Sequence, residues 1–209
     1  ELYAIRHGKE QRLTYSVPEE FLSVDWVKPE IVQFTGREGT RIPAMIYKQR
    51  NLDTTQRYPC VVFVHGAGYL QNVYRGWSYY YREFMFHTYL VSKGYIVFEV
   101  DYRGSAGYGR TYRTDVHMHL GGLDLQDELD GVEYLKGLGY IDSTRIGMYG
   151  GSYGGFLPLM ALFTSPQTYA CAAVLRAVTS WENYYRHNPW YTEPLLGTPE
   201  QNPEAYRIS

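Results

Sequence analysis

The stretch Tyr-Gly-Gly-Ser-Tyr-Gly-Gly-Phe, residues 149–156, places four glycines around a single serine, Ser152. It contains the pattern Gly-x-Ser-x-Gly, follows an apolar run at residues 145–149 that predicts a strand, and precedes a helical stretch at residues 156–163. A serine at such a turn has a strained backbone that exposes its hydroxyl, and glycine neighbours let the turn pass close to other backbone. The spacings of phosphate-binding and dinucleotide-binding loops are absent. The stretch therefore predicts a nucleophilic serine.

Other apolar runs extend this pattern into a sheet. Residues 59–64, 95–100 and 171–175 are continuous apolar segments, as expected of strands buried on both faces of a parallel sheet. Between them, residues 123–138 carry apolar side chains at helical spacing. Strands and helices alternate along the chain, which predicts an α/β fold with helices on both faces of the sheet.

The amino-terminal part has a different pattern. Residues 1–15 predict two short strands with a turn at residues 7–9, and residues 16–29 predict a connector with two prolines. Residues 31–34 and 42–47 then predict a second hairpin. An isolated two-stranded hairpin is marginally stable, so the first one is expected to belong to a larger sheet.

Composition excludes several classes of function. The 209 residues carry 22 acidic and 20 basic side chains, so no basic field predicts nucleic-acid binding. No apolar run is long enough for a membrane span. Cys60 and Cys171 lie in apolar runs and are expected to be buried free thiols. No cluster of histidines and cysteines has metal-ligand spacing, so neither a metal nor an organic cofactor is expected.

A second loop is expected to face Ser152. The residues His65-Gly66-Ala67-Gly68 follow the strand at residues 59–64, where this kind of fold places the second half of an oxyanion hole. Small residues there allow a backbone N–H to approach a substrate carbonyl. His65 precedes the serine, whereas the base of such folds comes last in the chain, so it is expected to orient its neighbours by hydrogen bonding.

Several stretches together resemble one known family. They are residues 64–68, 101–109, 142–146, 150–155 and 191–204. The chain is similar in these stretches to the catalytic domain of the prolyl oligopeptidase family of serine peptidases, on its dipeptidyl-peptidase IV and acylaminoacyl-peptidase side. The resemblance implies an α/β-hydrolase fold over residues 25–209. Residues 1–24 resemble the closing strands and linker of the β-propeller that precedes the hydrolase in this family.

The resemblance also implies roles for individual residues. Ser152 would be the nucleophile, and the Tyr153 backbone N–H would donate to the oxyanion. Many relatives have a tyrosine where this chain has His65, so the second donor would be the Ala67 N–H or the His65 imidazole. The pocket for the residue before the scissile bond would be lined by aromatic and apolar side chains: Tyr153, Val178, Trp181, Tyr184 and Tyr191. Such a pocket suits a peptide with proline or a small apolar residue there.

The sequence offers no base for the serine. A serine nucleophile needs an acidic residue and then a histidine after it in this fold. Only His187 follows Ser152, and it lies in a polar loop. We therefore expect the aspartate and histidine beyond Ser209, and residues 1–209 alone to be inactive; the absence of an initial methionine agrees with a longer protein.

Two alternatives stay open beside a peptidase. One is a catalytically inactive fold that binds peptides or a partner protein, and the other is an esterase of the same fold. The resemblance also leaves a homo-oligomer open for the full-length form.

Overall fold

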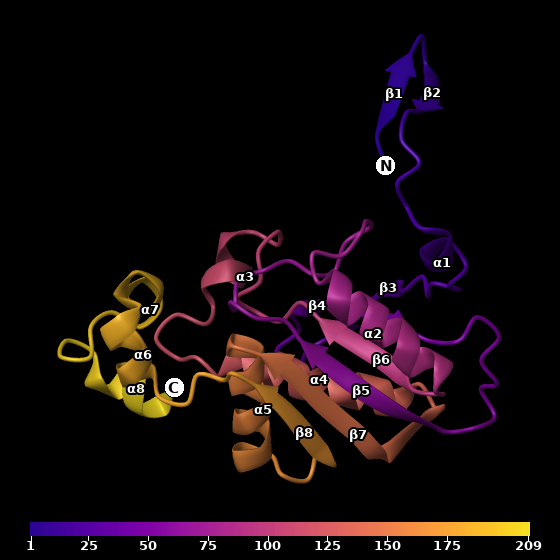
Figure 1. The fold of residues 1–209 in the computed structure, drawn as a ribbon. Helices are drawn as coiled ribbons and strands as arrows, with labels where there is room; N and C mark the ends of the chain where they lie inside the picture. Colours follow the sequence, from indigo (N-terminus) through magenta and orange to yellow (C-terminus); the bar gives the residue numbers. More distant parts are fainter.

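A computed structural model describes all 209 residues and centres on a mixed sheet (Figure 1). The sheet has six strands in the order β3-β4-β6-β5-β7-β8. The pairs β3–β4 and β4–β6 are antiparallel, and β6, β5, β7 and β8 run parallel. The strands are β3 (Glu30–Thr35), β4 (Arg41–Tyr47), β5 (Tyr58–Val64), β6 (Ile96–Val100), β7 (Ile141–Gly151) and β8 (Cys171–Leu175).

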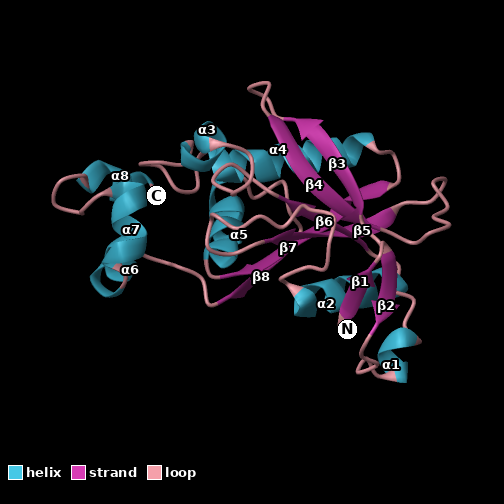
Figure 2. Cartoon of the chain, turned by 90° about the horizontal axis from the view of Figure 1, so that it is seen from above, coloured by secondary structure: helices cyan, strands magenta, loops and turns pink.

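Helices cover both faces of this sheet, as the sequence predicted (Figure 2). The helix α2 (Tyr81–Ser92) lies on one face, and α4 (Leu123–Gly137) and α5 (Tyr153–Thr164) lie on the other. Strand β4 shows why both faces are apolar. Its residues Ile42 and Ile46 join the large core with α4 and α5, whereas Met45 and Tyr47 join a smaller core beside α2. Alternate side chains of a strand point to opposite faces, so a strand covered on both sides must be apolar throughout.

The remaining elements are short. The hairpin of β1 and β2 stands apart from the six-stranded sheet, and α6 to α8 lie together beyond α5 (Figure 1). None of the helices is both long and apolar enough to cross a membrane. Their bounds are β1 (Tyr3–Arg6), β2 (Lys9–Arg12), α1 (Glu19–Leu22), α3 (Arg110–Thr114), α6 (Trp181–His187), α7 (Pro189–Leu196) and α8 (Pro203–Ile208).

Two sequence-based expectations need correction. The helix α5 begins at Tyr153, directly after the serine, and not at Phe156. The two glycines that precede Phe156 are already part of the helix. Cys60 is buried and free, as expected, but Cys171 is free and exposed. The reason is that β8 pairs only with β7 and forms an edge of the sheet.

The β8 edge predicts self-association of this chain. Its free side is apolar, and Leu175 is 49% exposed, so it offers unpaired backbone groups next to apolar side chains. We expect sedimentation velocity of residues 1–209 to show a mass that grows with concentration. Ala173→Lys, at an exposed position of the same strand, should reduce this growth because a charged edge resists pairing. A sharp monomer at all concentrations for the unsubstituted chain would contradict the prediction.

The carboxyl group of Glu128 on α4 is buried without a partner. Its side chain is 1% exposed, and neither of its oxygens accepts or donates a hydrogen bond. The Tyr169 hydroxyl donates to the backbone carbonyl of Glu128 and does not reach the carboxyl group. Burial raises the pKa of Glu128 well above its ordinary value, and the nearby carboxylates of Asp127 and Asp124 act in the same direction.

This buried acid makes stability depend on pH. Because the folded-state pKa lies above the unfolded one, its contribution is fully present below the unfolded pKa and is lost as pH rises through the folded pKa. We expect Glu128→Gln to increase the free energy of unfolding at pH 8 and to change it little near pH 5, as measured by urea unfolding. Glu133→Gln, at an exposed position on the same helix, removes the same charge and should show no such pH-dependent gain. An equal effect of Glu128→Gln at both pH values would contradict the assignment.

Candidate active site

Ser152 stands at the turn between β7 and α5 in a strained conformation. Its φ is 60° and its ψ is −120°, a region that residues with a side chain rarely occupy. The turn is held from both sides. The Ser152 N–H donates to the Leu175 carbonyl at 2.9 Å, and the Ser152 carbonyl accepts from the N–H groups of Gly155 and Phe156. The end of β8 therefore fixes the conformation of the serine.

The glycines of this turn have a steric cause. A Cβ atom on Gly150 or on Gly154 would collide with the carbonyl oxygen of Val64, the last residue of β5. A Cβ on Gly154 would also lie 2.7 Å from the His65 carbonyl oxygen. No side chain fits at either position, because the serine turn passes directly over the end of the neighbouring strand.

The loop after β5 packs against the serine turn. A Cβ atom on Gly66 would lie 3.2 Å from the Gly151 carbonyl oxygen and 3.9 Å from the Ser152 Cβ. Ala67 has a φ of 60°, and its carbonyl accepts a hydrogen bond from the Tyr191 hydroxyl at 2.7 Å. The Ala67 N–H makes no hydrogen bond within the protein. As the first residue of α5, Tyr153 likewise has an N–H without an intrahelical acceptor. The structure thus brings together two predicted oxyanion donors next to Ser152.

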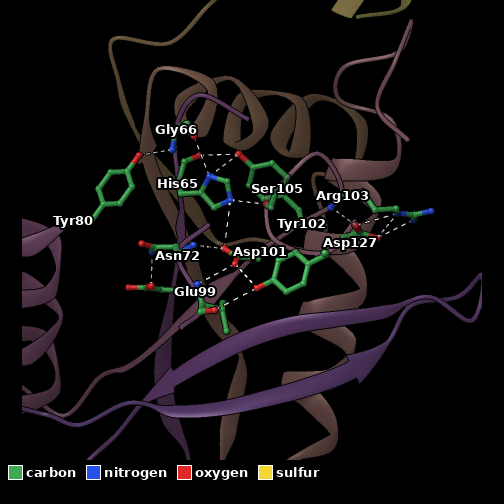
Figure 3. A network of polar contacts seen from close by, with 12 residues as sticks. His65, Gly66, Asn72, Tyr80, Glu99, Asp101, Tyr102, Arg103, Ser105 and Asp127 are labelled. Atoms are coloured by element: carbon green, nitrogen blue, oxygen red, sulfur yellow. Dashed lines mark hydrogen bonds and ion pairs between the residues drawn. The ribbon is translucent and has the colours of Figure 1, made fainter. Parts of the chain in front are cut away.

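The His65 imidazole does not take part in this arrangement. It is 1% exposed, its Nδ1 lies 3.0 Å from the Gly66 carbonyl oxygen, and its Nε2 lies 2.9 Å from the Ser105 hydroxyl (Figure 3). Its ring stacks on Tyr102 with a centroid distance of 4.3 Å. Burial lowers the pKa of His65, so it is neutral at neutral pH. Neither nitrogen is free for an oxyanion, which leaves the expected orienting role.

A buried Ser-His-Asp grouping here is not a catalytic triad. The Asp101 carboxylate lies 3.7 Å from Nε2 of His65, the same nitrogen that contacts Ser105. A triad needs its acid on the other nitrogen and its serine at the surface, whereas Ser105 is 0% exposed. The grouping belongs to the internal framework of the loops.

Asp101 ties the loop after β5 to the end of β6. Its carboxylate accepts from the backbone N–H groups of Asn72 at 2.8 Å and Val73 at 3.0 Å, and from the Tyr108 hydroxyl at 2.6 Å (Figure 3). Nearby, Arg103 forms a buried ion pair with Asp127 on α4 at 2.8 Å. Sequence reasoning missed these roles, although the polar Asp-Tyr-Arg run directly after a mostly apolar strand was a signal for them.

The predicted pocket residues gather in one aromatic cluster. Trp181 lies 5.7 Å from Tyr153, 5.7 Å from Tyr184 and 6.4 Å from Tyr191 between ring centroids, and Val178 is buried beside them in the same core. The Tyr153 hydroxyl donates to the buried carboxylate of Asp124.

The side chains around Trp181 and Tyr153 are tightly packed. Trp181 is 4% exposed, and the hollow beside Ala67 and Tyr153 has no volume for a water molecule. A cavity of about 430 Å³ opens instead between α5, α6 and α8, and Val178 and Trp181 reach it.

No base contacts the serine within residues 1–209. The Ser152 hydroxyl forms no hydrogen bond with any side chain of the described residues, and His187 is exposed at the end of α6. No group of three or more histidine, cysteine, aspartate or glutamate side chains could hold a metal ion. The arrangement is one strained serine with two backbone N–H groups nearby that make no hydrogen bond within the protein.

A strained serine between a parallel strand and a helix, with the loop after the neighbouring strand packed against its turn, is typical of an α/β-hydrolase. The family model described as the prolyl oligopeptidase family matches residues 82–209. The chain belongs to the prolyl oligopeptidase family, as the motifs indicated.

The chain is similar to proteins named as dipeptidyl peptidases and acylaminoacyl peptidases. It is 34% identical over 188 residues to human dipeptidyl peptidase 8, covering 88% of this chain and 20% of that protein. The structure of Porphyromonas gingivalis dipeptidyl peptidase 4 matches with 27% identity and a TM-score of 0.80, covering 91% of this chain and 26% of that one. Pyrococcus horikoshii acylaminoacyl peptidase matches with 26% identity and a TM-score of 0.81, covering 97% and 32%. The chain spans about a fifth of the curated relative's length.

The crowded glycine predicts a sharp effect of one methyl group. We expect Gly154→Ala to lower the free energy of unfolding by about 3 kcal/mol, because its Cβ collides with rigid backbone and overpacking at such a site costs that much. Gly137→Ala is the matched control, since this helical glycine has open space around it and an alanine there should stabilise by about 0.5 kcal/mol. Urea unfolding measures both. Equal stability of the two variants would mean that the turn does not pass so close to β5.

Proposed function

We propose that this chain carries the nucleophile and the oxyanion hole of a serine peptidase. The observation that supports it is the strained Ser152 next to the unpartnered N–H groups of Tyr153 and Ala67. In the proposed reaction the Ser152 Oγ attacks the peptide carbonyl and forms a bond to its carbon. The carbonyl electron pair moves to oxygen, where the two N–H groups stabilise the charge. This tetrahedral intermediate then collapses: the C–N bond breaks, the amine leaves with the proton taken from Ser152, and the acyl-enzyme remains. Water hydrolyses the acyl-enzyme and frees Ser152.

The reaction also needs a group that removes the proton from Ser152. Since no base contacts the serine within residues 1–209, we assign this role to a histidine, oriented by an aspartate, outside these residues. Residues 1–209 alone are then inactive. The end of β8, where the Leu175 carbonyl holds Ser152, has a free edge on which a further strand could pair and bring such residues to the serine.

The proposed substrates are peptides with proline or a small apolar residue before the scissile bond, cleaved in a dipeptidyl- or oligopeptidase manner. The names of the relatives and the aromatic cluster of Tyr153, Trp181, Tyr184 and Tyr191 support this class. An aromatic wall next to the nucleophile favours a flat apolar ring over a charged side chain.

The proposed domain division separates residues 1–24 from residues 25–209. The hairpin of β1 and β2 stands apart from the sheet (Figure 1) and exposes apolar side chains, Ile5 at 78% and Tyr15 at 77%. A hairpin with an uncovered apolar face is typical of a piece of a larger sheet. This arrangement supports the assignment of the hairpin to a β-propeller.

Labelling with a fluorophosphonate tests the nucleophile. The complete protein that contains these residues should be labelled, and Ser152→Ala should abolish the labelling because the attacking oxygen is lost. Ser92→Ala, at an exposed position on α2, serves as the control and should leave the labelling unchanged. Residues 1–209 alone should remain unlabelled.

Three outcomes would contradict the proposal. Labelling that persists in Ser152→Ala would show that another residue is the nucleophile. No labelling of the complete protein would favour a module that binds peptides or a partner protein. The observation that favours this alternative is that no base contacts Ser152 within residues 1–209. Hydrolysis of simple esters without any hydrolysis of peptides would favour the esterase.

A further inference from the structure

The hydroxyl group of Tyr80 lies beside the nucleophile. Tyr80 precedes α2, and its hydroxyl accepts a hydrogen bond from the Gly66 N–H at 2.7 Å (Figure 3). A Cβ atom on Gly66 would lie 3.1 Å from this hydroxyl oxygen and 3.9 Å from the Ser152 Cβ. The position of a Gly66 Cβ is thus within van der Waals range of both the Tyr80 hydroxyl and the Ser152 side chain.

The proton of this hydroxyl has no acceptor inside the protein. In its one hydrogen bond the Tyr80 oxygen accepts, so the O–H is free to donate. The side chain is half-buried, so the hydroxyl is not sealed in the core. Its ring is held edge-on against Phe63 at a centroid distance of 5.2 Å, and the Tyr80 N–H donates to the Ser78 hydroxyl at 3.0 Å. The donor is thus positioned before any substrate arrives.

The surroundings keep this hydroxyl protonated and polarise it. Burial raises the pKa of Tyr80, so the O–H is present at neutral pH, while the Gly66 N–H and the positive charge of Arg176 oppose this rise. The Arg176 guanidinium carbon lies 3.3 Å from where a Cβ on Gly151 would be, which places this charge next to the serine turn. A hydroxyl that already accepts a hydrogen bond is a stronger donor, because chains of hydrogen bonds polarise one another.

We infer that the Tyr80 hydroxyl is a third donor to the oxyanion. It accepts the hydrogen bond of the Gly66 N–H and donates its own O–H in place of that N–H. This inference rests on the proposed function of Ser152. During attack, negative charge develops on the substrate carbonyl oxygen, and the Tyr80 O–H donates a hydrogen bond to it without transferring its proton. The Gly66 N–H acts on the oxyanion through the hydroxyl. Tyr80 is then a catalytic residue that the strand-end loop motif does not contain.

Tyr80→Phe in the complete protein tests the inference. It removes the hydroxyl and keeps the ring against Phe63. We expect kcat to fall about 100-fold, as for the loss of one oxyanion donor, with KM changed less than about threefold. A peptide aldehyde, which forms an oxyanion on the serine, should bind weaker by a similar factor, and a non-reacting peptide of the same sequence should bind as before. Tyr79→Phe, at an 87% exposed neighbour, should change none of these values.

Three results would overturn the assignment or its basis. Unchanged kcat and aldehyde affinity in Tyr80→Phe would show that the hydroxyl does not meet the oxyanion. Equal weakening of the aldehyde and the non-reacting peptide would show that Tyr80 only positions the Gly66 loop. Full activity of Ser152→Ala would reject the proposed function itself, independently of Tyr80.

Discussion

The carbonyl oxygen of Val64 constrains the whole site. It lies where β5 ends, under the turn that leaves β7, and it excludes a side chain from both Gly150 and Gly154. Adjacent parallel strands end at the same edge of a sheet, so a turn that starts a helix there must cross its neighbour closely. Ser152 takes its strained conformation in this crossing, and the loop after β5 is brought within reach of it. The strained serine and the loop that carries the proposed oxyanion donor are therefore positioned by one backbone contact.

Buried charges hold the loops around this contact. Asp101 fixes the backbone at Asn72 and Val73, and on the other face of the sheet His87 lies 2.6 Å from both Glu99 and the Tyr149 hydroxyl. These groups lie at or near the ends of β6 and β7, where the apolar core gives way to the loops. A buried network of hydrogen bonds and ion pairs permits few alternative arrangements, so it restrains the loops without a larger apolar core.

The pattern of apolar residues predicted the strands and helices because burial on both faces leaves a local signal in the sequence. The sequence also predicted the strained turn between strand and helix at Ser152, because the glycines beside it are required by local steric crowding. Other features depend on partners that are distant in the sequence. The His65 side chain is buried because it forms a hydrogen bond with Ser105 and stacks on Tyr102. Cys171 is exposed because β8 is an edge strand. Tyr80 reaches the site through a loop whose path no local pattern specifies.

The aromatic cluster has a consequence for the affinity of the proposed peptidase. Trp181 and Tyr191 stack on each other, and the Tyr191 hydroxyl donates a hydrogen bond to the Ala67 carbonyl, in the loop that carries one of the proposed oxyanion donors. A ligand that binds between these two rings selects the fraction of molecules in which they have separated, and its apparent dissociation constant rises in inverse proportion to that fraction. Since Tyr191 links the cluster to Ala67, such a ligand also acts on the equilibrium of the loop that carries Ala67. In the proposed peptidase, binding in the pocket and the position of an oxyanion donor are therefore coupled.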